Sequence, residues 1–472
     1  MPELIRDVLY LIFKELQDDD KTLCSCLLVN KTFCEIIIPI LWKNPWKFIK
    51  KEKEKFLLNV IISHLSDESK NYLSQHNFLI NSYHRPLFDY INFCKHLNLN
   101  EIQRIINMTF YDKPEMSIFI VENEILNIFI NENMKYTHLY MPDEIDFQIN
   151  LIPGAESCFS EIEFLSCSNG IDDSIVAGLT EICKSIKELE LDIKMYKSNY
   201  GIARLIEAQR KLLKIDLTNY MYNDVTLDNS LSKHVNAVQY LRMNGEFLAE
   251  FLPFFVNLRV LDLDCSDMEW YYLENYLGEN YLEEYYLENN ISLPFLRILR
   301  SSQVSTKFLT YLINNTSGYL DEIKIEEGHN EIDNKKIIQA IYQNCPNLRY
   351  LRLLIRNINI LELQNLLMNC QYLVGLYLII DNEFDAFGLD NLFKVLTKSS
   401  PTYLYRLGFD SAYKINKLES FKRFFSNWKG RHPMILKLGY VNNTKKFSNL
   451  IEKYKAKGVI KKYENSKQFV LF

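Results

Sequence analysis

The sequence lacks the closely spaced cysteines and histidines that bind structural metal ions. Its ten cysteines and eight histidines are scattered over 472 residues, and no Cys-x-x-Cys or His-x-x-x-His pair occurs. Cys24 and Cys26 lie too close together for the usual zinc knuckle, and no histidine pair supports them. These spacings exclude a RING-type zinc domain. They predict reduced, mostly buried cysteines and a cytoplasmic and/or nuclear protein.

Long apolar runs are also missing. No segment reaches the roughly 18 consecutive apolar residues that span a membrane. Glu3, Arg6 and Asp7 interrupt the apolar start, so a signal peptide is not expected. The net charge of -6 argues against binding to nucleic acid through phosphate neutralisation. We therefore expect neither a membrane nor a nucleic-acid partner.

The sequence contains no recognisable catalytic motif. It has no glycine-rich phosphate loop, no Gly-x-Ser-x-Gly turn and no cysteine–histidine pairing in a suitable local context. We expect no cofactor, no metal ion and no catalytic residue. The chain is interpreted as a binding protein and not as an enzyme.

The overall composition is that of a folded protein. Hydrophobic residues make up 48% and charged residues 24% of the chain. A chain of 472 residues is too long for one ordinary compact core. A second domain or an elongated repeat array is therefore expected.

The first 42 residues predict three short helices. The triplet Asp18–Asp20 ends the first helix and offers N-cap oxygens to a second helix over Lys21–Asn30. A third helix follows over Lys31–Ile38, and Pro39 is expected to stop it. So small a unit leaves apolar surface uncovered, which marks a partner site. The apolar residues of the first helix are Leu4, Ile5, Val8, Leu9, Ile12, Phe13 and Leu16.

This ordered string resembles an F-box, the helical module that docks a substrate receptor onto the Skp adaptor of a cullin ubiquitin ligase. The family pattern Leu-Pro-x-Glu-Leu-Leu aligns with residues 4–9, where Ile5 replaces proline and Asp7 replaces glutamate. Phe33 replaces a frequent tryptophan, and Trp42 falls at the family's late Leu-Trp. The resemblance implies Skp-facing and core roles for Ile5, Val8, Leu9, Ile12, Phe13, Leu16, Leu27, Leu28 and Val29.

A second pattern recurs from about residue 136: the phrase apolar-x-x-Leu-x-apolar. Most steps between copies fall within or close to the roughly 20–29 residues of leucine-rich repeats. Each phrase predicts a short strand whose leucines point into a core, followed by a helix such as Lys335–Tyr342 or Leu361–Met368. The alternative is a set of unrelated buried strands in another α/β fold. The central positions are 139, 165, 189, 215, 241, 261, 299, 323, 351, 376, 407 and 438.

Three copies carry a cysteine before the phrase, at Cys183, Cys345 and Cys370. This resembles the cysteine-containing repeat of F-box proteins with leucine-rich repeats. The predicted fold class is α/β: a three-helix F-box over 1–46, a helical linker over 47–130, and a solenoid of about twelve repeats over 131–472. Parallel strands should form the concave face, with the helices outside. Within the linker, Pro86–Cys94 and Ile102–Ile106 are expected to be helical.

The strand positions between the leucines are expected to face the concave side and bind a protein substrate. Tyrosine and arginine are favoured anchors in such interfaces. Acidic residues on several neighbouring strands favour a partner with basic segments: Glu188, Glu190, Asp192, Asp216, Asp262, Asp264, Glu322 and Glu326. The predicted substrate-binding residues are Tyr240, Arg242, Asp262, Asp264, Arg300, Tyr350, Arg352 and Tyr377.

One low-complexity segment, residues 270–290, interrupts the repeats with tyrosine, leucine, glutamate and asparagine. It predicts an expanded repeat helix, a projecting loop that binds a partner, or an expansion without a role.

Three functions are weighed. The first is a non-catalytic substrate receptor of a Skp–cullin–F-box ubiquitin ligase, whose partners are the Skp adaptor, through it a cullin, and an unknown protein substrate. The second is a leucine-rich-repeat scaffold that recruits no ligase. The third, an unrecognised enzyme on the repeat scaffold, has no support in the sequence.

Overall fold

A computed structural model describes residues 5–76, 78, 86–145, 147–194, 197–219, 225–244, 252–264, 291–326, 331–381, 388–411, 418–439 and 445–465. The chain divides into two compact units. The first comprises Met1–Ile215 with Asp224–Lys233, and the second comprises Asp216–Asn223 with His234–Phe472. The segment 270–290, for which a helix or a loop was expected, lies outside the described residues.

The first unit begins with helices and continues as a repeat array. The N-terminal helices are α1 (Arg6–Glu15), α2 (Asp20–Cys26) and α3 (Lys31–Trp42), followed by η1 (Lys51–Lys53), α4 (Glu54–Ser63), α5 (Asp67–Gln75) and η2 (Ile91–Phe93). The array then comprises β1 (His96–Asn98), α6 (Leu99–Thr109), α7 (Glu115–Phe129), β2 (His138–Tyr140), η3 (Ile149–Leu151), α8 (Ala155–Phe159), β3 (Phe164–Ser168), α9 (Asp173–Ile182), β4 (Glu188–Asp192), α10 (Tyr200–Glu207) and α11 (Val225–Ser232). Strand β5 (Lys214–Thr218) includes the boundary between the units.

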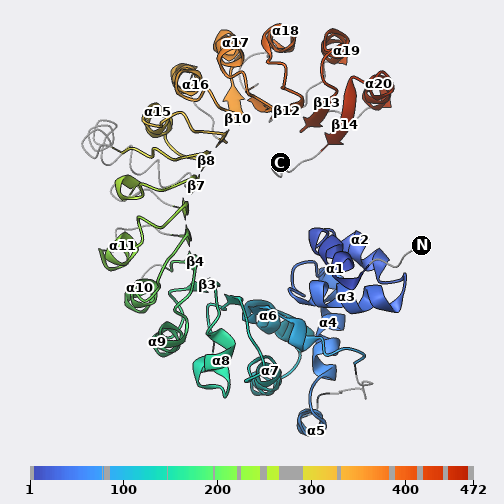
Figure 1. Cartoon of the computed structure of the whole chain (residues 1–472), viewed down its shortest axis with the longest axis vertical. Helices are drawn as coiled ribbons and strands as arrows, with labels where there is room; N and C mark the ends of the chain where they lie inside the picture. The colour runs from blue at the N-terminus through green and yellow to red at the C-terminus, as the bar shows by residue number, and fades with distance from the viewer. Residues whose placement is uncertain are drawn as a thin grey trace. The chain divides into compact units, whose positions relative to one another are not determined.

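The second unit alternates strands and helices throughout. Its elements are β6 (Tyr240–Asn244), η4 (Leu252–Phe254), β7 (Val260–Asp264), β8 (Ile298–Ser302), α15 (Thr306–Asn314), β9 (Glu322–Ile325), α16 (Glu331–Asn344), β10 (Tyr350–Ile355), η5 (Asn357–Asn359), α17 (Ile360–Asn369), β11 (Gly375–Ile380), α18 (Leu389–Ser399), β12 (Arg406–Ser411), α19 (Leu418–Asn427), β13 (Met434–Leu438), α20 (Lys445–Ala456) and β14 (Ile460–Asn465). From β8 onward the strands lie on one side and the helices α15–α20 on the other (Figure 1).

Parallel pairing in sequence order defines the fold within each unit. Strands β1 to β4 pair successively in the first unit, and β6 to β14 do so in the second. Each pairing places the central apolar residues side by side, as for Leu351 beside Leu376 and Leu376 beside Leu407. All twelve predicted central residues lie in strands and are at most 1% exposed. The predicted α/β leucine-rich-repeat solenoid, with parallel strands and outer helices, is confirmed.

A repeated backbone contact fixes the register of successive strands. The carbonyl just before one strand accepts two hydrogen bonds from consecutive N–H groups at the start of the next strand. Lys95 O accepts from Thr137 N at 2.9 Å and from His138 N at 3.2 Å. In the second unit, Arg349 O accepts from Val374 N at 2.8 Å and Gly375 N at 3.0 Å. Strands β1 to β5 and β7 to β12 begin with both hydrogen bonds, and β13 begins with one of them. Because these strands take backbone partners from the preceding segment, no single repeat folds alone.

The same contact joins the N-terminal helices to the array. Lys43 directly follows α3, and its carbonyl accepts from Lys95 N at 2.9 Å and from His96 N at 3.2 Å. The indole of Trp46 donates to His96 O at 2.9 Å. The end of α3 therefore takes the place of a preceding repeat, and the first unit holds its three helices through backbone hydrogen bonds.

Buried asparagines hold the loops that follow two strands. Asn334 donates from Nδ2 to Leu354 O at 2.8 Å, and Asn359 donates to Asn334 Oδ1 at 2.9 Å. Asn169 donates to Asn199 Oδ1 at 2.8 Å in the first unit. All four are at most 7% exposed, and these bonds satisfy amide groups that would otherwise be costly to bury.

Three local expectations differ from the structure. The helix α3 continues through Pro39 to Trp42, because Ile40 and Leu41 pack against the core of the three helices. This packing outweighs the roughly 3 kcal/mol that an internal proline costs. Residues Pro86–Cys94 contain only the 3-10 turn η2 where a helix was expected. The last predicted strand, β13, is centred on Leu436 in the register of β12 and not on residue 438.

The array extends beyond the predicted repeats at both ends. Strand β1 lies inside the segment 47–130, for which only helices were expected, and β14 follows the last predicted copy. Cys94 and Leu97 do fit the repeat phrase, but two helices, α6 and α7, separate β1 from β2. That long step removes the regular spacing that identified the other copies.

We predict that Leu376→Ala destabilises the second unit by about 2–5 kcal/mol, because it opens a cavity beside fully buried leucines. Urea denaturation followed by circular dichroism measures the loss. The matched control is Leu361→Ala on α17, where the leucine is 72% exposed, and this change should cost less than about 0.5 kcal/mol. Equal effects of the two substitutions would contradict the assigned register.

Candidate functional site

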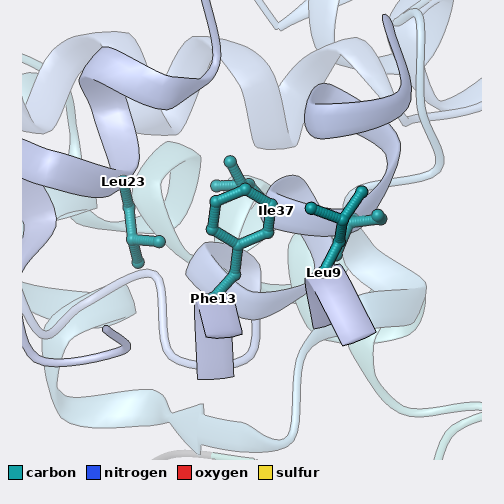
Figure 2. Close-up of a cluster of buried hydrophobic side chains, with 5 residues drawn as sticks. Leu9, Phe13, Leu23 and Ile37 are labelled. Carbon is teal, nitrogen blue, oxygen red and sulfur yellow. The ribbon is translucent and has the colours of Figure 1, made fainter. Parts of the chain in front are cut away.

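The three N-terminal helices share a small core. Leu9 and Phe13 of α1, Leu23 of α2, and Ile36 and Ile37 of α3 are at most 9% exposed and form one cluster. Figure 2 shows Leu9, Phe13, Leu23 and Ile37 gathered together. The helices need this core because each is too short to be stable alone.

Two N-caps set the starts of the second and third helices. Asp19 accepts a hydrogen bond from Thr22 N at 3.1 Å, as expected of the acidic triplet. Asn30 accepts from Phe33 N at 2.9 Å. The thiol of Cys34 donates to Leu27 O at 2.9 Å, which fixes the turn between α2 and α3.

A set of apolar side chains remains exposed around this core. Ile5 is 70% exposed, Val8 40% and Ile12 45%, along α1 and its N-cap. In the turn after α2, Leu28 is 89% and Val29 61% exposed. We call these five residues the N-terminal apolar surface. Burying them against a partner would contribute on the order of 5–10 kcal/mol, at about 1.5–3 kcal/mol for each fully buried side chain, less the entropic cost of association.

The nine residues predicted to be Skp-facing or core divide between these two environments. Five form the N-terminal apolar surface. Leu9 and Phe13 are buried in the helix core, and Leu16 and Leu27 pack against it while half-buried. The last four can support a binding surface by holding the helices, but they contribute little exposed area. The helical spacing of the apolar residues did not distinguish the exposed from the buried ones, because α1 is apolar on more than one face.

A second candidate surface is the inner face of the second unit. By inner face we mean three strand positions in each repeat. They lie one residue before, one residue after and three residues after the buried central residue. The register places Arg242, Asp262, Arg300 and Arg352 in one row across neighbouring strands. Tyr377 continues this row on β11. The structure therefore brings these five predicted substrate-binding residues onto one face.

The other three predicted residues occupy the adjoining rows. Tyr240 and Tyr350 begin β6 and β10, and Asp264 ends β7. All eight predicted residues are half-buried. Their side chains are thus accessible at one end and held by neighbours at the other, as interface anchors commonly are.

Ion pairs link much of the charge on this face. Arg300 Nε lies 3.0 Å from Glu322 Oε1, and Arg352 Nε lies 2.9 Å from Glu326 Oε1. Arg242 lies 3.6 Å from Asp216. Half-buried pairs of this kind orient the guanidinium groups and reduce the net charge of the face.

Near the C-terminal end the face contains groups that the sequence analysis missed. Lys437 is 7% exposed, and burial lowers the pKa of its ammonium group. Burial also raises the pKa of Asp410, and it raises the pKa of Tyr377 to about 12. The alternation of leucine and lysine in β13 places Lys437 on the inner face whether the strand is centred on Leu436 or on Leu438, so the sequence did contain this signal. Asp410 lies beyond the predicted Leu-x-Phe phrase.

The inner face of the first unit begins with stacked aromatic rings. The ring centroids of His96 and His138 are 3.7 Å apart, and those of His138 and Phe164 are 5.2 Å apart. Tyr140 lies 4.9 Å from Phe164. The amide of Asn44 lies 3.3 Å from His96 Nδ1, which therefore accepts a hydrogen bond when the ring is neutral.

Neither a membrane-spanning helix nor a cluster of metal ligands occurs among the described residues. No described helix is both long enough and apolar enough to cross a bilayer. Across the same ranges, no three histidine, cysteine, aspartate or glutamate residues gather as metal ligands.

Of the comparisons with known proteins, the one with solved structures finds similar chains. Neither a scan of protein-family models nor a search of curated proteins finds a match. Among solved structures, the chain is similar to the leucine-rich-repeat-containing protein LegL7 from Legionella pneumophila, at 15% identity and a TM-score of 0.31. The likeness covers 68% of this chain and 91% of that one. The assignment as a leucine-rich-repeat protein rests on the strand register and buried leucines described above.

We predict that Gly408→Ala destabilises the second unit by about 1–3 kcal/mol, because the new Cβ would lie 2.0 Å from Tyr377 Cδ1. Urea denaturation measures the change. The control is the same substitution in a Tyr377→Ala background, where the added methyl group meets no ring and should cost less. An equal cost in both backgrounds would show that Tyr377 does not lie over Gly408.

A pH dependence follows from His96. Burial lowers the pKa of this histidine to about 3, and His138, Lys43 and Lys47 add to the effect. An unfolded chain takes up the proton near pH 6.5. Between these values the unfolded state binds more protons, so His96 lowers stability progressively as the pH falls from about 6.5 to 3.

We therefore predict that His96→Gln reduces the difference in thermal midpoint between pH 7 and pH 5. Differential scanning fluorimetry at both pH values measures it. The control His432→Gln, at an exposed histidine, should leave the difference unchanged. If the His96 variant shows the same difference in thermal midpoint as the wild type, the pKa of His96 is not lowered in the folded protein.

Proposed function

We propose that this protein is a non-catalytic substrate receptor of a Skp–cullin–F-box ubiquitin ligase in the cytoplasm or nucleus. The repeats bind a protein substrate, and the N-terminal helices bind the Skp adaptor, which carries the cullin. The chemistry belongs to other subunits, and the receptor acts by proximity. The leucine-rich-repeat fold itself supports a protein-interaction role.

The observation that carries the proposal is the N-terminal apolar surface. Its five apolar residues are 40–89% exposed, although the three-helix unit has a buried core of its own. Exposed apolar groups of this kind mark a protein-binding site. They fall within the residues whose order resembles an F-box, with Asp19 and Asn30 as helix caps.

The junction between α3 and β1 supports the same function. A receptor must hold its substrate at a defined distance from the ubiquitin donor. Here the carbonyl of Lys43 and the indole of Trp46 bond directly to the first strand. Trp42 also contacts Tyr90, with ring centroids 4.6 Å apart and the rings tilted by 35°. These contacts leave little freedom between the adaptor-binding helices and the start of the array.

The second candidate is a leucine-rich-repeat scaffold that recruits no ligase. Ile5 favours it, because this residue replaces the proline that opens the F-box pattern. A scaffold would use the same inner faces but would either bind no adaptor or bind it without bringing the cullin.

We predict that Ile12→Asp with Leu28→Asp removes adaptor binding, because a carboxylate buried in an apolar interface costs several kcal/mol. Co-purification of the full chain with the Skp adaptor and a cullin measures it. The wild type should bring down both partners, and the variant should lose more than about a hundredfold in adaptor affinity. Both residues are exposed, so the variant should remain folded.

The matched control places aspartate at two exposed leucines elsewhere, Leu151 and Leu361, which are 73% and 72% exposed. It should bind both partners like the wild type. Retention of the adaptor by the Ile12 and Leu28 variant would remove this surface from the interface. A wild-type chain that binds the adaptor without the cullin would establish the scaffold, and one that binds neither would overturn the proposal.

A further inference from the structure

The inner face of the first unit changes from aromatic to acidic between β2 and β4. Phe164 of β3 lies in register with Glu188 of β4. In the next row, Tyr140 of β2 lies beside Ser166, which lies beside Glu190. We call Tyr140, Phe164, Glu188 and Glu190 the aromatic–acidic face. Strand alternation predicted that the two carboxylates face outward, but it did not predict the rings beside them.

Glu188 and Glu190 lie close enough to Tyr140 to affect the pKa of its hydroxyl group electrostatically. Burial raises the pKa of the Tyr140 hydroxyl, and the charges of Glu190 and Glu188 raise it further. Both rings are half-buried and both glutamates are exposed. A side chain that rests on the rings would therefore meet the two carboxylates at its end.

The ion pair between Lys214 and Glu188 is weak enough for a partner's cation to replace the lysine. Lys214 Nζ lies 3.4 Å from Glu188 Oε2, with the two side chains 37% and 48% exposed. Exposed pairs of this kind contribute about 0–1 kcal/mol. An incoming cation that also contacts the rings can displace the lysine at little cost.

We propose that the aromatic–acidic face binds an arginine side chain within an extended segment of a partner protein. The guanidinium plane stacks on Phe164 and Tyr140, and its N–H groups donate to Glu188 and Glu190. The proposal rests on the inner face as the partner-binding surface and does not depend on recruitment of a ligase.

The chemistry of the face favours arginine over lysine. A guanidinium is planar, stacks on aromatic rings and presents donors in a fork that matches a carboxylate. A cation over a ring contributes about 0.5–1 kcal/mol at an exposed site, which is about twofold to fivefold in affinity. An ammonium group gains the charge attraction but less of the stacking.

The inner face of the second unit also has a carboxylate beside a ring, since Asp262 acts on the Tyr240 hydroxyl, but Arg242 and Arg300 act on the same ring. Arg300 and Arg352 are held there by Glu322 and Glu326. On the aromatic–acidic face the cation is Lys214, which forms only a weak, exposed pair with Glu188. The aromatic–acidic face is therefore the more complementary of the two to a basic segment.

The test uses fluorescein-labelled octa-arginine as the probe and the full-length chain, by fluorescence anisotropy at low salt, where surface charges are least screened. Glu188→Gln with Glu190→Gln should weaken binding about fivefold. The control Glu156→Gln with Glu181→Gln changes the net charge equally at two exposed helix positions and should stay within twofold of the wild type. Equal losses in the two variants would overturn the proposal.

A second variant tests the rings. Phe164→Leu should reduce the preference for octa-arginine over octa-lysine about threefold. An unchanged preference would overturn the proposed stacking on Phe164. If this variant does not fold, the Glu188→Gln, Glu190→Gln variant alone tests the proposal. Adaptor co-purification with the glutamate variant should equal the wild type. If the wild type does not bind the adaptor but the two glutamate variants differ in octa-arginine binding as expected, only the ligase assignment is overturned. If the wild type binds the adaptor but the two variants bind octa-arginine equally, only this proposal is overturned.

Discussion

The backbone carbonyl that accepts two hydrogen bonds from the start of the next strand is the contact on which the rest of the structure depends. It begins strands β1 to β5 and β7 to β12 and aligns them, so that the central leucine or isoleucine of one repeat meets that of its neighbour. The alignment places the alternate residues in rows, and those rows form the inner faces. Where Lys43 provides the carbonyl, the same contact attaches the N-terminal helices to β1. One backbone geometry therefore positions both candidate surfaces.

The repeat core was largely predictable from the sequence because leucine at a fixed phrase position has one physical reason, burial in a shared core. All twelve central positions proved buried in strands. The terminal strands were harder, because β1 contains a single leucine, Leu97, and is followed by two helices before β2. Pro39 was misjudged because tertiary packing of Ile40 and Leu41 compensates for a lost helical hydrogen bond.

The candidate surfaces were predictable in part. Periodicity identified α1 as apolar but did not separate Phe13, which is buried, from Ile12, which is 45% exposed. Strand alternation placed the eight inner-face residues correctly on one side, since period two needs no tertiary information. It did not reveal that Arg352 is paired with Glu326, or that Tyr377 lies over Gly408, because both contacts cross between repeats.

The most direct test of the central claim, that α3 is joined to the array as a preceding repeat would be, is amide hydrogen exchange by mass spectrometry. The N–H groups of Lys95 and His96 should exchange within about tenfold of those of Thr137 and His138, because all four donate to equivalent carbonyls. Exchange of Lys95 and His96 within seconds, with Thr137 and His138 still protected, would show that the N-terminal helices are not held by the strands.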